Sequence, residues 1–123
     1  PLDNPLIKGD KTKLIQVLIN AFKNSAEAFD ELKDDRQKTL HIQLRKDEEN
    51  KMVELSITDN AIGFDPSLSQ QLLEKGNTHK KTGTGFGLYN CKQIIETHQG
   101  QISITSNGPG EGAAFIIKIP YTT

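Results

Sequence analysis

The sequence predicts an α+β domain in which helices cover one face of a largely antiparallel sheet. Two hydrophobic periods support this fold class. In the segments 10–32 and 88–97, apolar residues recur every three or four positions, as in a helix that packs on a core. In four short segments between residues 40 and 119 they alternate with polar residues, as in a half-buried strand. Because the strands come in two consecutive pairs, we expect antiparallel hairpins rather than a parallel sheet.

A helix is expected directly after Gly9. Asp10 or Thr12 can act as its N-cap, because a side-chain oxygen at that position accepts a hydrogen bond from a free backbone N–H. The polar run 33–38 ends the helix. Its face toward the core, at a period of 3.6, consists of Leu14, Val17, Leu18, Ala21, Ser25, Ala28, Phe29 and Leu32.

Two alternating runs then predict a β-hairpin. The residues 47–50 between the runs are polar and suit a turn. The apolar positions of the two strands are Leu40, Ile42 and Leu44, followed by Val53, Leu55 and Ile57.

The second half of the chain contains two further helices and a second pair of strands. A short helix is predicted over 67–75, behind Pro66, and the polar, glycine-rich stretch 76–87 is predicted to be a loop. A longer helix follows, with Gly100 as its stop. Its apolar positions are Leu88, Cys91, Ile94 and Ile95, and the last two strands lie around 102–104 and 115–119. The predicted order is therefore αββααββ.

Composition limits the classes of partner and compartment. We expect a single domain over 1–123, since 123 residues can bury a core of their own. A formal charge of −1 gives no electrostatic reason to expect nucleic acid or a membrane surface as a partner. The one cysteine, Cys91, excludes a disulfide framework and fits a reducing compartment, so we expect a cytoplasmic location even if a parent protein is membrane-anchored. Because the chain begins at Pro1, we expect it to be a fragment of a longer protein.

The stretch NAFKNSAEA places Asn20 and Asn24 one turn apart at the edge of the apolar face of the first helix. Asparagine inside a helix costs roughly 0.5–0.7 kcal/mol relative to alanine, so two together suggest a role. A neutral amide oxygen suits Mg²⁺, which keeps most of its waters and shares phosphate ligands. The alternative is a solvated flank of the helix.

The stretch ITDNAIGFDP breaks a strand pattern at Asp59. A carboxylate at a strand end can accept a hydrogen bond from an exocyclic amine of a base, and Gly63 would let the backbone approach a flat ring. The alternative is a turn in which Asp59 or Asn60 bonds only its own backbone.

Two glycine-rich stretches complete the candidate motifs. In KTGTGFGLYN, glycines open directly into a helix, whose free N–H groups favour an anion. The spacing fits neither a P-loop nor a dinucleotide fingerprint, and a mobile loop is the alternative. The stretch GPGEGAAF can be read simply as a hairpin turn.

Taken in order, these four motifs resemble the ATP-binding domain shared by gyrase, the heat-shock chaperone, histidine kinases and mismatch-repair ATPases. LIQVLINAFKNSAEAF is similar to the N box, DNAIGF to the first glycine box and GTGFGLY to the second. GEGAAFIIKIP is similar to the terminal glycine box and last strand of a bacterial sensor histidine kinase. The resemblance covers residues 10–120. It implies the Bergerat ATP-binding fold, a two-layer α/β sandwich with a mixed, mostly antiparallel sheet.

The resemblance also implies roles for matching residues, with ATP and Mg²⁺ as the bound groups. Asn24 would coordinate the Mg²⁺, Asn20 would lie at the phosphates, and Asp59 would bind the adenine amino group. Gly63 would line the base, and Lys80 matches the lysine of the family's ATP lid. Gly83, Gly85 and Gly87 would form the lid hinge, and further nucleotide contacts would come from Lys23, Ala61, Thr82, Thr84, Phe86, Leu88 and Ala114.

One position favours a kinase over a hydrolase. Hydrolytic members of the superfamily carry a glutamate four residues before the metal-binding asparagine, as the base that activates water, and this chain has Asn20 there. Without a base, the γ-phosphoryl is kept for another acceptor. His41, His79 and His98 lack the sequence context of the family's acceptor.

The expected function is therefore transfer from Mg-ATP to a histidine on a separate dimerisation domain, which passes the phosphoryl group to a response regulator in two-component signal transduction. We expect the fragment to be monomeric and its parent to be a homodimer. Ala61 replaces the first glycine of its box, and Ala114 stands where threonine is common. Two alternatives stay open: a serine/threonine kinase of the anti-sigma-factor type, and a non-catalytic nucleotide-binding or interaction module.

Overall fold

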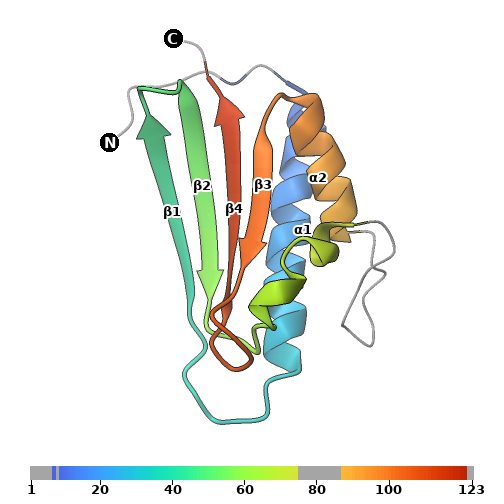
Figure 1. Cartoon of the computed structure of the whole chain (residues 1–123), viewed down its shortest axis with the longest axis vertical. Coiled ribbons are helices and arrows are strands. Elements are labelled where there is room, and N and C mark those ends of the chain that lie inside the picture. Colours follow the sequence, from blue (N-terminus) through green and yellow to red (C-terminus); the bar gives the residue numbers. More distant parts are fainter. Residues whose placement is uncertain (1–6, 8, 75–86, 122–123) are drawn as a thin grey trace.

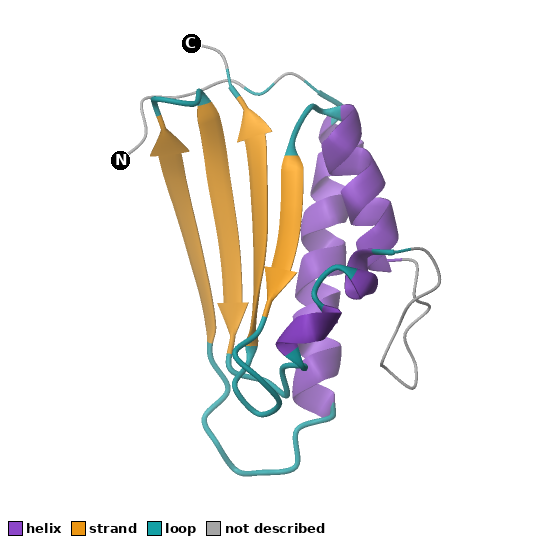
Figure 2. Ribbon diagram, in the orientation of Figure 1, coloured by secondary structure: helices purple, strands orange, loops and turns teal. Residues whose placement is uncertain are grey.

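A computed structural model describes residues 7, 9–74 and 87–121. Figure 1 and Figure 2 show two layers, with the strands side by side and the α-helices together on one side of the sheet. The elements in chain order are α1 (Lys11–Asp30), β1 (Leu40–Asp47), β2 (Met52–Asp59), the short 3₁₀ helices η1 (Pro66–Leu68) and η2 (Gln71–Leu73), α2 (Gly87–Thr97), β3 (Gln101–Thr105) and β4 (Ala113–Pro120). The α+β class is confirmed.

The four strands form one sheet in the order β1-β2-β4-β3. All three pairings among the described strands are antiparallel. In this register Asp59, the last residue of β2, lies between Leu40 of β1 and Ala113 of β4. The end of β2 therefore lies beside the point where β4 begins.

The core lies between the helices and one face of the sheet. Ile57 pairs with Phe115, and both are buried on the face that meets α1 and α2. The buried residues of this cluster are Val17, Ala21, Ile57, Leu72, Leu73, Cys91, Ile95, Ile104, Phe115, Ile117 and Ile119. The predicted placement of Cys91 in the core is confirmed, since its side chain is fully buried.

Helix α1 begins as the sequence predicts. Asp10 is its N-cap, and its carboxylate Oδ1 accepts a hydrogen bond from the Lys13 N–H at 3.1 Å. The backbone N–H of Asp10 donates to Nε2 of His98 at 3.0 Å, and Nδ1 of that ring lies 2.7 Å from the Ile94 carbonyl. The imidazole therefore joins the start of α1 to the end of α2.

The prediction of one short helix over 67–75 is wrong. Two separate 3₁₀ helices occupy most of this stretch, and Asp65 caps the first by accepting from the Ser67 N–H at 3.0 Å. Leu72 and Leu73 are the buried residues of this segment. With two adjacent apolar anchors and few others, the segment has no apolar stripe long enough to hold an α-helix on the core.

The stop of α2 differs from the prediction by one residue. Gln99, not Gly100, has the positive φ, at 60°. The Gly100 N–H donates to the Ile95 carbonyl at 2.9 Å and the Gln99 N–H to the Glu96 carbonyl at 3.0 Å, which together make a Schellman motif. Glycine is needed at 100 for a different reason: a Cβ there would collide with the Lys118 carbonyl oxygen of β4.

Candidate functional site

The carboxylate of Asp59 is held at three of its hydrogen-bonding positions. Oδ1 accepts from the backbone N–H groups of Ala61 at 3.0 Å and Ala113 at 3.1 Å. Oδ2 accepts from the Ser25 hydroxyl at 2.9 Å. Asp59 and Ser25 are only 7% and 5% exposed, so these bonds lie out of bulk water. A carboxylate has about four acceptor positions, and the bonds from the described residues leave one of them on Oδ2 for a further donor.

The turn after Asp59 accommodates an alanine without strain. Ala61 is fully buried, and its φ is outside the left-handed region. The methyl group at this position is therefore part of the packed structure and needs no glycine-only backbone. The backbone at position 61 therefore tolerates alanine where the resembled family has glycine.

The glycines of this region allow two loops, 60–65 after β2 and 106–112 before β4, to approach closely. Gly63 has a φ of 61°, and a Cβ there would lie 2.5–2.7 Å from the Gly108 and Gly112 carbonyl oxygens and the Ser106 hydroxyl. Gly112 has a φ of 73°, and a Cβ there would collide with the Asp59 carbonyl. Both positions therefore require glycine for conformation and for space.

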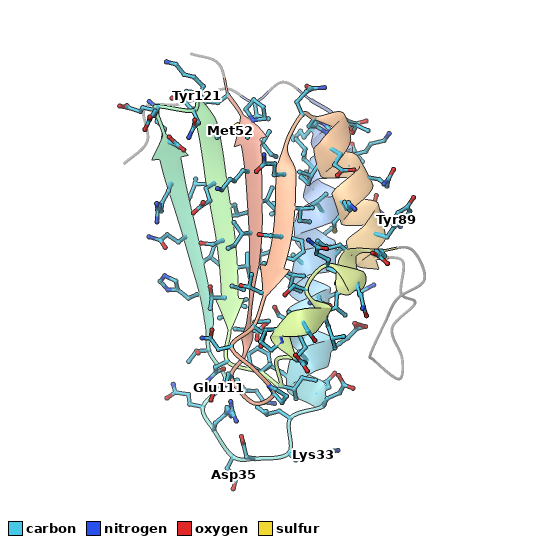
Figure 3. All side chains as sticks on the ribbon, in the orientation of Figure 1. Lys33, Asp35, Met52, Tyr89, Glu111 and Tyr121 are labelled. Atoms are coloured by element: carbon cyan, nitrogen blue, oxygen red, sulfur yellow. The ribbon has the colours of Figure 1, made fainter. Side chains whose placement is uncertain are left out.

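Ser106 is the hydrogen-bonding centre between these loops. Its hydroxyl lies 2.6 Å from the Gly112 carbonyl and accepts from the Phe64 N–H at 3.1 Å. The Gly112 N–H also donates to the Ala61 carbonyl at 3.1 Å. The loop that looked like a simple hairpin turn is thus joined to the turn that holds Asp59. Figure 3 shows Glu111, which belongs to this loop, at the end of the sheet opposite Met52 and Tyr121.

The two asparagines of α1 are half-buried, as their position at the edge of the apolar face predicts. Asn24 directly precedes Ser25, so α1 supplies both a candidate metal ligand and a partner of Asp59. The Asn20 side chain makes a hydrogen bond with the Cys91 thiol of α2. Burial raises the pKa of this thiol to about 11, and the hydrogen bond with Asn20 acts in the opposite direction. Cys91 is therefore a protonated core residue at neutral pH.

The remaining predicted site residues are distributed differently. Lys23 is exposed on α1, Gly87 is the first residue of α2, and Leu88 is half-buried against the core. Ala114 pairs with the exposed Thr58, on the outward face of the sheet, so Ala113 is the alanine beside Asp59. Predictions for Lys80, Thr82, Gly83, Thr84, Gly85 and Phe86 lie outside the described residues.

Comparison with known proteins places the fold and these motifs in a family. A family model described as "Histidine kinase-, DNA gyrase B-, and HSP90-like ATPase" matches residues 9–123. The chain belongs to this ATPase family. Membership in a family of ATPases implies that the domain binds ATP.

Curated relatives of this ATPase domain are named as kinases of bacteria. Sporulation kinase B of Bacillus subtilis is 39% identical over 115 residues, which are 94% of this chain and 25% of that protein. The signal transduction histidine-protein kinase AtoS of Escherichia coli is 36% identical over 121 residues, which are 97% of this chain and 19% of that protein. The chain spans a quarter or less of the length of these relatives.

Solved structures agree on the fold of the ATPase domain. The catalytic domain of the histidine kinase ThkA matches with a TM-score of 0.75 at 29% identity, over 93% of this chain and 70% of that one. Full-length ShkA in complex with AMPPNP matches with a TM-score of 0.79 at 21% identity, over 97% of this chain and 24% of that one. At that identity the second match supports the fold alone.

Three contacts of the site have only weak signals in the sequence. Ser25 was expected on the apolar face of α1, and a hydroxyl at a buried position beside Asn24 was the available signal. Ser106 and Ala113 act through loop geometry and a backbone N–H, which the residue type does not show.

Among the described residues, no helix is long and apolar enough to span a bilayer.

Proposed function

We propose that this chain binds Mg-ATP and presents its γ-phosphoryl group to a histidine on a separate dimerisation domain of the parent protein. The phosphoryl group would then pass to a response regulator in two-component signalling. The observation that carries the proposal is the buried, three-way-held carboxylate of Asp59 in a chain of the histidine kinase-like ATPase family.

The base end of the site follows from the chemistry of Asp59. A purine amino group is a donor, and the acceptor position left on Oδ2 can receive it. A 6-oxo purine would instead place a carbonyl oxygen against a buried carboxylate, with neither group able to donate. The carboxylate is fixed before the ligand arrives, so little ordering is required on binding. Asp59 is therefore expected to select adenine over hypoxanthine.

The phosphate end follows from the donor set of α1. Asn24 offers one amide oxygen, which suits a Mg²⁺ ion whose other ligands are phosphate oxygens and water. Asn20 lies one turn earlier on the same helix and would bond the phosphates. The metal would supply charge neutralisation at the phosphates, while Lys80 is proposed to add a positive charge from the lid.

Transfer is favoured over hydrolysis because Asn20 cannot act as a general base. An amide takes up no proton near neutral pH, so water held beside the γ-phosphate would not be activated by this side chain. A histidine nitrogen needs no such base: it forms a bond to the γ-phosphorus while the bond to the bridging oxygen breaks and ADP leaves. The chain's own contribution is to position ATP and stabilise charge.

The experiment uses the parent protein with and without Asn24→Ala, incubated with Mg-ATP labelled at the γ-phosphate. The intact parent is expected to gain phosphate that is labile to acid and stable to base, as a phosphohistidine is. Asn24→Ala should lose at least about 90% of this label if the metal ligand is needed. Acid-stable label on the protein would favour a serine/threonine kinase, and steady ATP hydrolysis without label would contradict transfer to histidine.

A further inference from the structure

The segment between α1 and β1 returns to the end of the sheet where Asp59 lies. Figure 3 shows Lys33 and Asp35 of this segment at the same end of the molecule as Glu111. From the sequence alone, the segment is expected only to end α1, because it is a run of polar residues. Its side chains nevertheless make specific bonds to both loops that hold Asp59.

Arg36 bridges the two loops with one nitrogen. Its Nη1 donates to the Asn60 carbonyl at 3.0 Å and to the Gly110 carbonyl at 2.7 Å. These residues lie 24 and 74 positions away in the sequence. A guanidinium presents five N–H donors in a planar fork, so it can hold two carbonyl oxygens on one side and still bind an anion on the other.

Asp34 orients the guanidinium from the other side. Nε of Arg36 lies 2.9 Å from Oδ1 of Asp34, and Nη2 lies 2.6 Å from Oδ2, which is a bidentate pair. The hydrogen bond with Arg36 lowers the pKa of the Asp34 carboxyl. Both groups are charged at neutral pH, and the paired bonds direct the planar fork toward the two carbonyls.

Asn60 strengthens the same connection. Its Oδ1 accepts from the Thr39 N–H at 2.8 Å, and its Nδ2 donates to the Gln37 carbonyl at 2.7 Å. The two neighbouring residues therefore have different roles. The Asp59 carboxylate belongs to the candidate site, and the Asn60 side chain binds the turn to the segment after α1.

The bonds continue from Arg36 to Asp59 through the backbone. Asn60 directly precedes Ala61, and the loop from Gly110 leads to Ala113; the N–H groups of these two alanines hold Oδ1 of Asp59. The Gly112 N–H also donates to the Ala61 carbonyl at 3.1 Å, so a backbone hydrogen bond joins the same two loops that Arg36 bridges.

We propose that Arg36 is a positioning residue of the nucleotide site: by joining the Asn60 and Gly110 carbonyls, it sets the direction of the Asp59 carboxylate and hence the preference for a 6-amino purine. This inference rests on the proposed function, because it requires that Asp59 bind the base.

The test measures dissociation constants of the 123-residue chain for Mg-ATP and Mg-ITP by calorimetry, at a temperature where thermal melts show every variant folded. Arg36→Met keeps the side-chain stem and removes the donors. Arg45→Met is the matched control, since Arg45 lies on the outward face of β1 with Nε 3.9 Å from Glu54. Arg36→Lys and Asp34→Asn are milder changes to the same cluster.

Arg36→Met should weaken ATP binding about fivefold to tenfold and change ITP binding less than about twofold, so the preference for ATP collapses. Arg36→Lys and Asp34→Asn should show smaller losses in the same direction, and Arg45→Met none. If Arg36→Met does not fold, the ratio of the two constants in Arg36→Lys decides.

An unchanged ATP preference in a folded Arg36 variant would overturn the inference while leaving the proposed function intact. Equal losses for ATP and ITP would also overturn it, because they indicate general loosening of the site. A wild-type chain that does not prefer ATP to ITP would overturn the base-binding role of Asp59 and this inference together.

Discussion

At the scale of single residues, the bond between Ser25 and Asp59 is the shortest of the three that hold the carboxylate. It joins α1 to the end of β2 in a buried position, where a lost donor leaves a charged oxygen without its partner. Ser25→Ala should lower the free energy of unfolding by about 2 kcal/mol. Urea titration measures this, with the exposed Ser103→Ala on β3 as the matched control. Equal effects of the two changes would contradict the stabilising role of the bond.

Ala61 provides a second residue-scale prediction, because its methyl is fully buried on an unstrained backbone. Ala61→Gly removes packing and adds freedom to the unfolded chain, so the free energy of unfolding should fall by about 1 kcal/mol. Affinity for Mg-ATP should stay within about twofold of the wild type. A clear rise in affinity would instead show that the methyl obstructs the site.

The reactivity of the Cys91 thiol tests whether the core between α1 and α2 excludes water and reagents. Burial raises the pKa of its thiol to about 11 from an ordinary value of 9.0, so the native thiolate fraction near pH 8 should be about 100-fold lower than in the unfolded chain. A disulfide reagent should therefore label the native protein at least about 100-fold more slowly than the protein in urea. Comparable rates would contradict the closed core.

The same shift makes stability depend on pH in a defined direction. The thiol is protonated in both states below about pH 9, so it does not change stability there. Between about pH 9 and 11 only the unfolded chain releases the proton, and this favours unfolding. The free energy of unfolding should therefore fall, through Cys91, as the pH rises through that range.

At the scale of elements, the backbone strain at the end of α2 can be removed by a mutation. Gln99 adopts a φ of 60°, which costs an L-residue roughly 1 kcal/mol relative to glycine. Gln99→Gly should therefore raise the free energy of unfolding by about 0.5–1 kcal/mol, after allowance for the freer unfolded chain. Thermal or urea unfolding measures the change. Gly100→Ala should be destabilising, because its Cβ would collide with β4; stabilisation by that change would contradict the assigned geometry.

The two α-helices and the strands were predictable because each depends on a local hydrophobic period. The face of α1 and the alternation of β2 and β4 follow from residues close together in the sequence. The strand β1 also forms, but the prediction that it is half-buried is wrong, because its apolar residues Leu40, Ile42 and Leu44 are exposed. The stretch 67–75 was not predictable in the same way, since its helix type depends on how Leu72 and Leu73 meet the core. The need for glycine at position 100 comes from its close approach to the Lys118 carbonyl of β4, a contact that the local sequence does not show.

At the scale of the whole molecule, the site is assembled from segments that the sequence keeps far apart. Asp59 could be singled out because it interrupts a strand pattern, but its partner Ser25 lies 34 positions away. Arg36 stands in a polar run with no pattern of its own, and only the fold brings it to Asn60 and Gly110. The motifs therefore point to the candidate site, while the contacts that hold its residues follow from the tertiary structure.

The two layers of the fold supply different residues of the candidate site. The end of the sheet supplies Asp59 and the N–H groups that hold it, and α1 supplies Ser25 and Asn24. The central claim is that this end of the molecule binds the adenine of ATP through the Asp59 carboxylate.

Calorimetric titration of Mg-ATP into the wild-type chain and into Asp59→Asn tests this claim most directly. Asparagine has the same shape, but it replaces a charged acceptor with a neutral amide. Binding to the wild type is expected, with a loss of at least about tenfold in Asp59→Asn. Asp65→Asn, an exposed cap six residues further along, is the matched control and should bind as the wild type does. Equal affinity of the wild type and Asp59→Asn, or no binding of ATP by the wild type, would contradict the account.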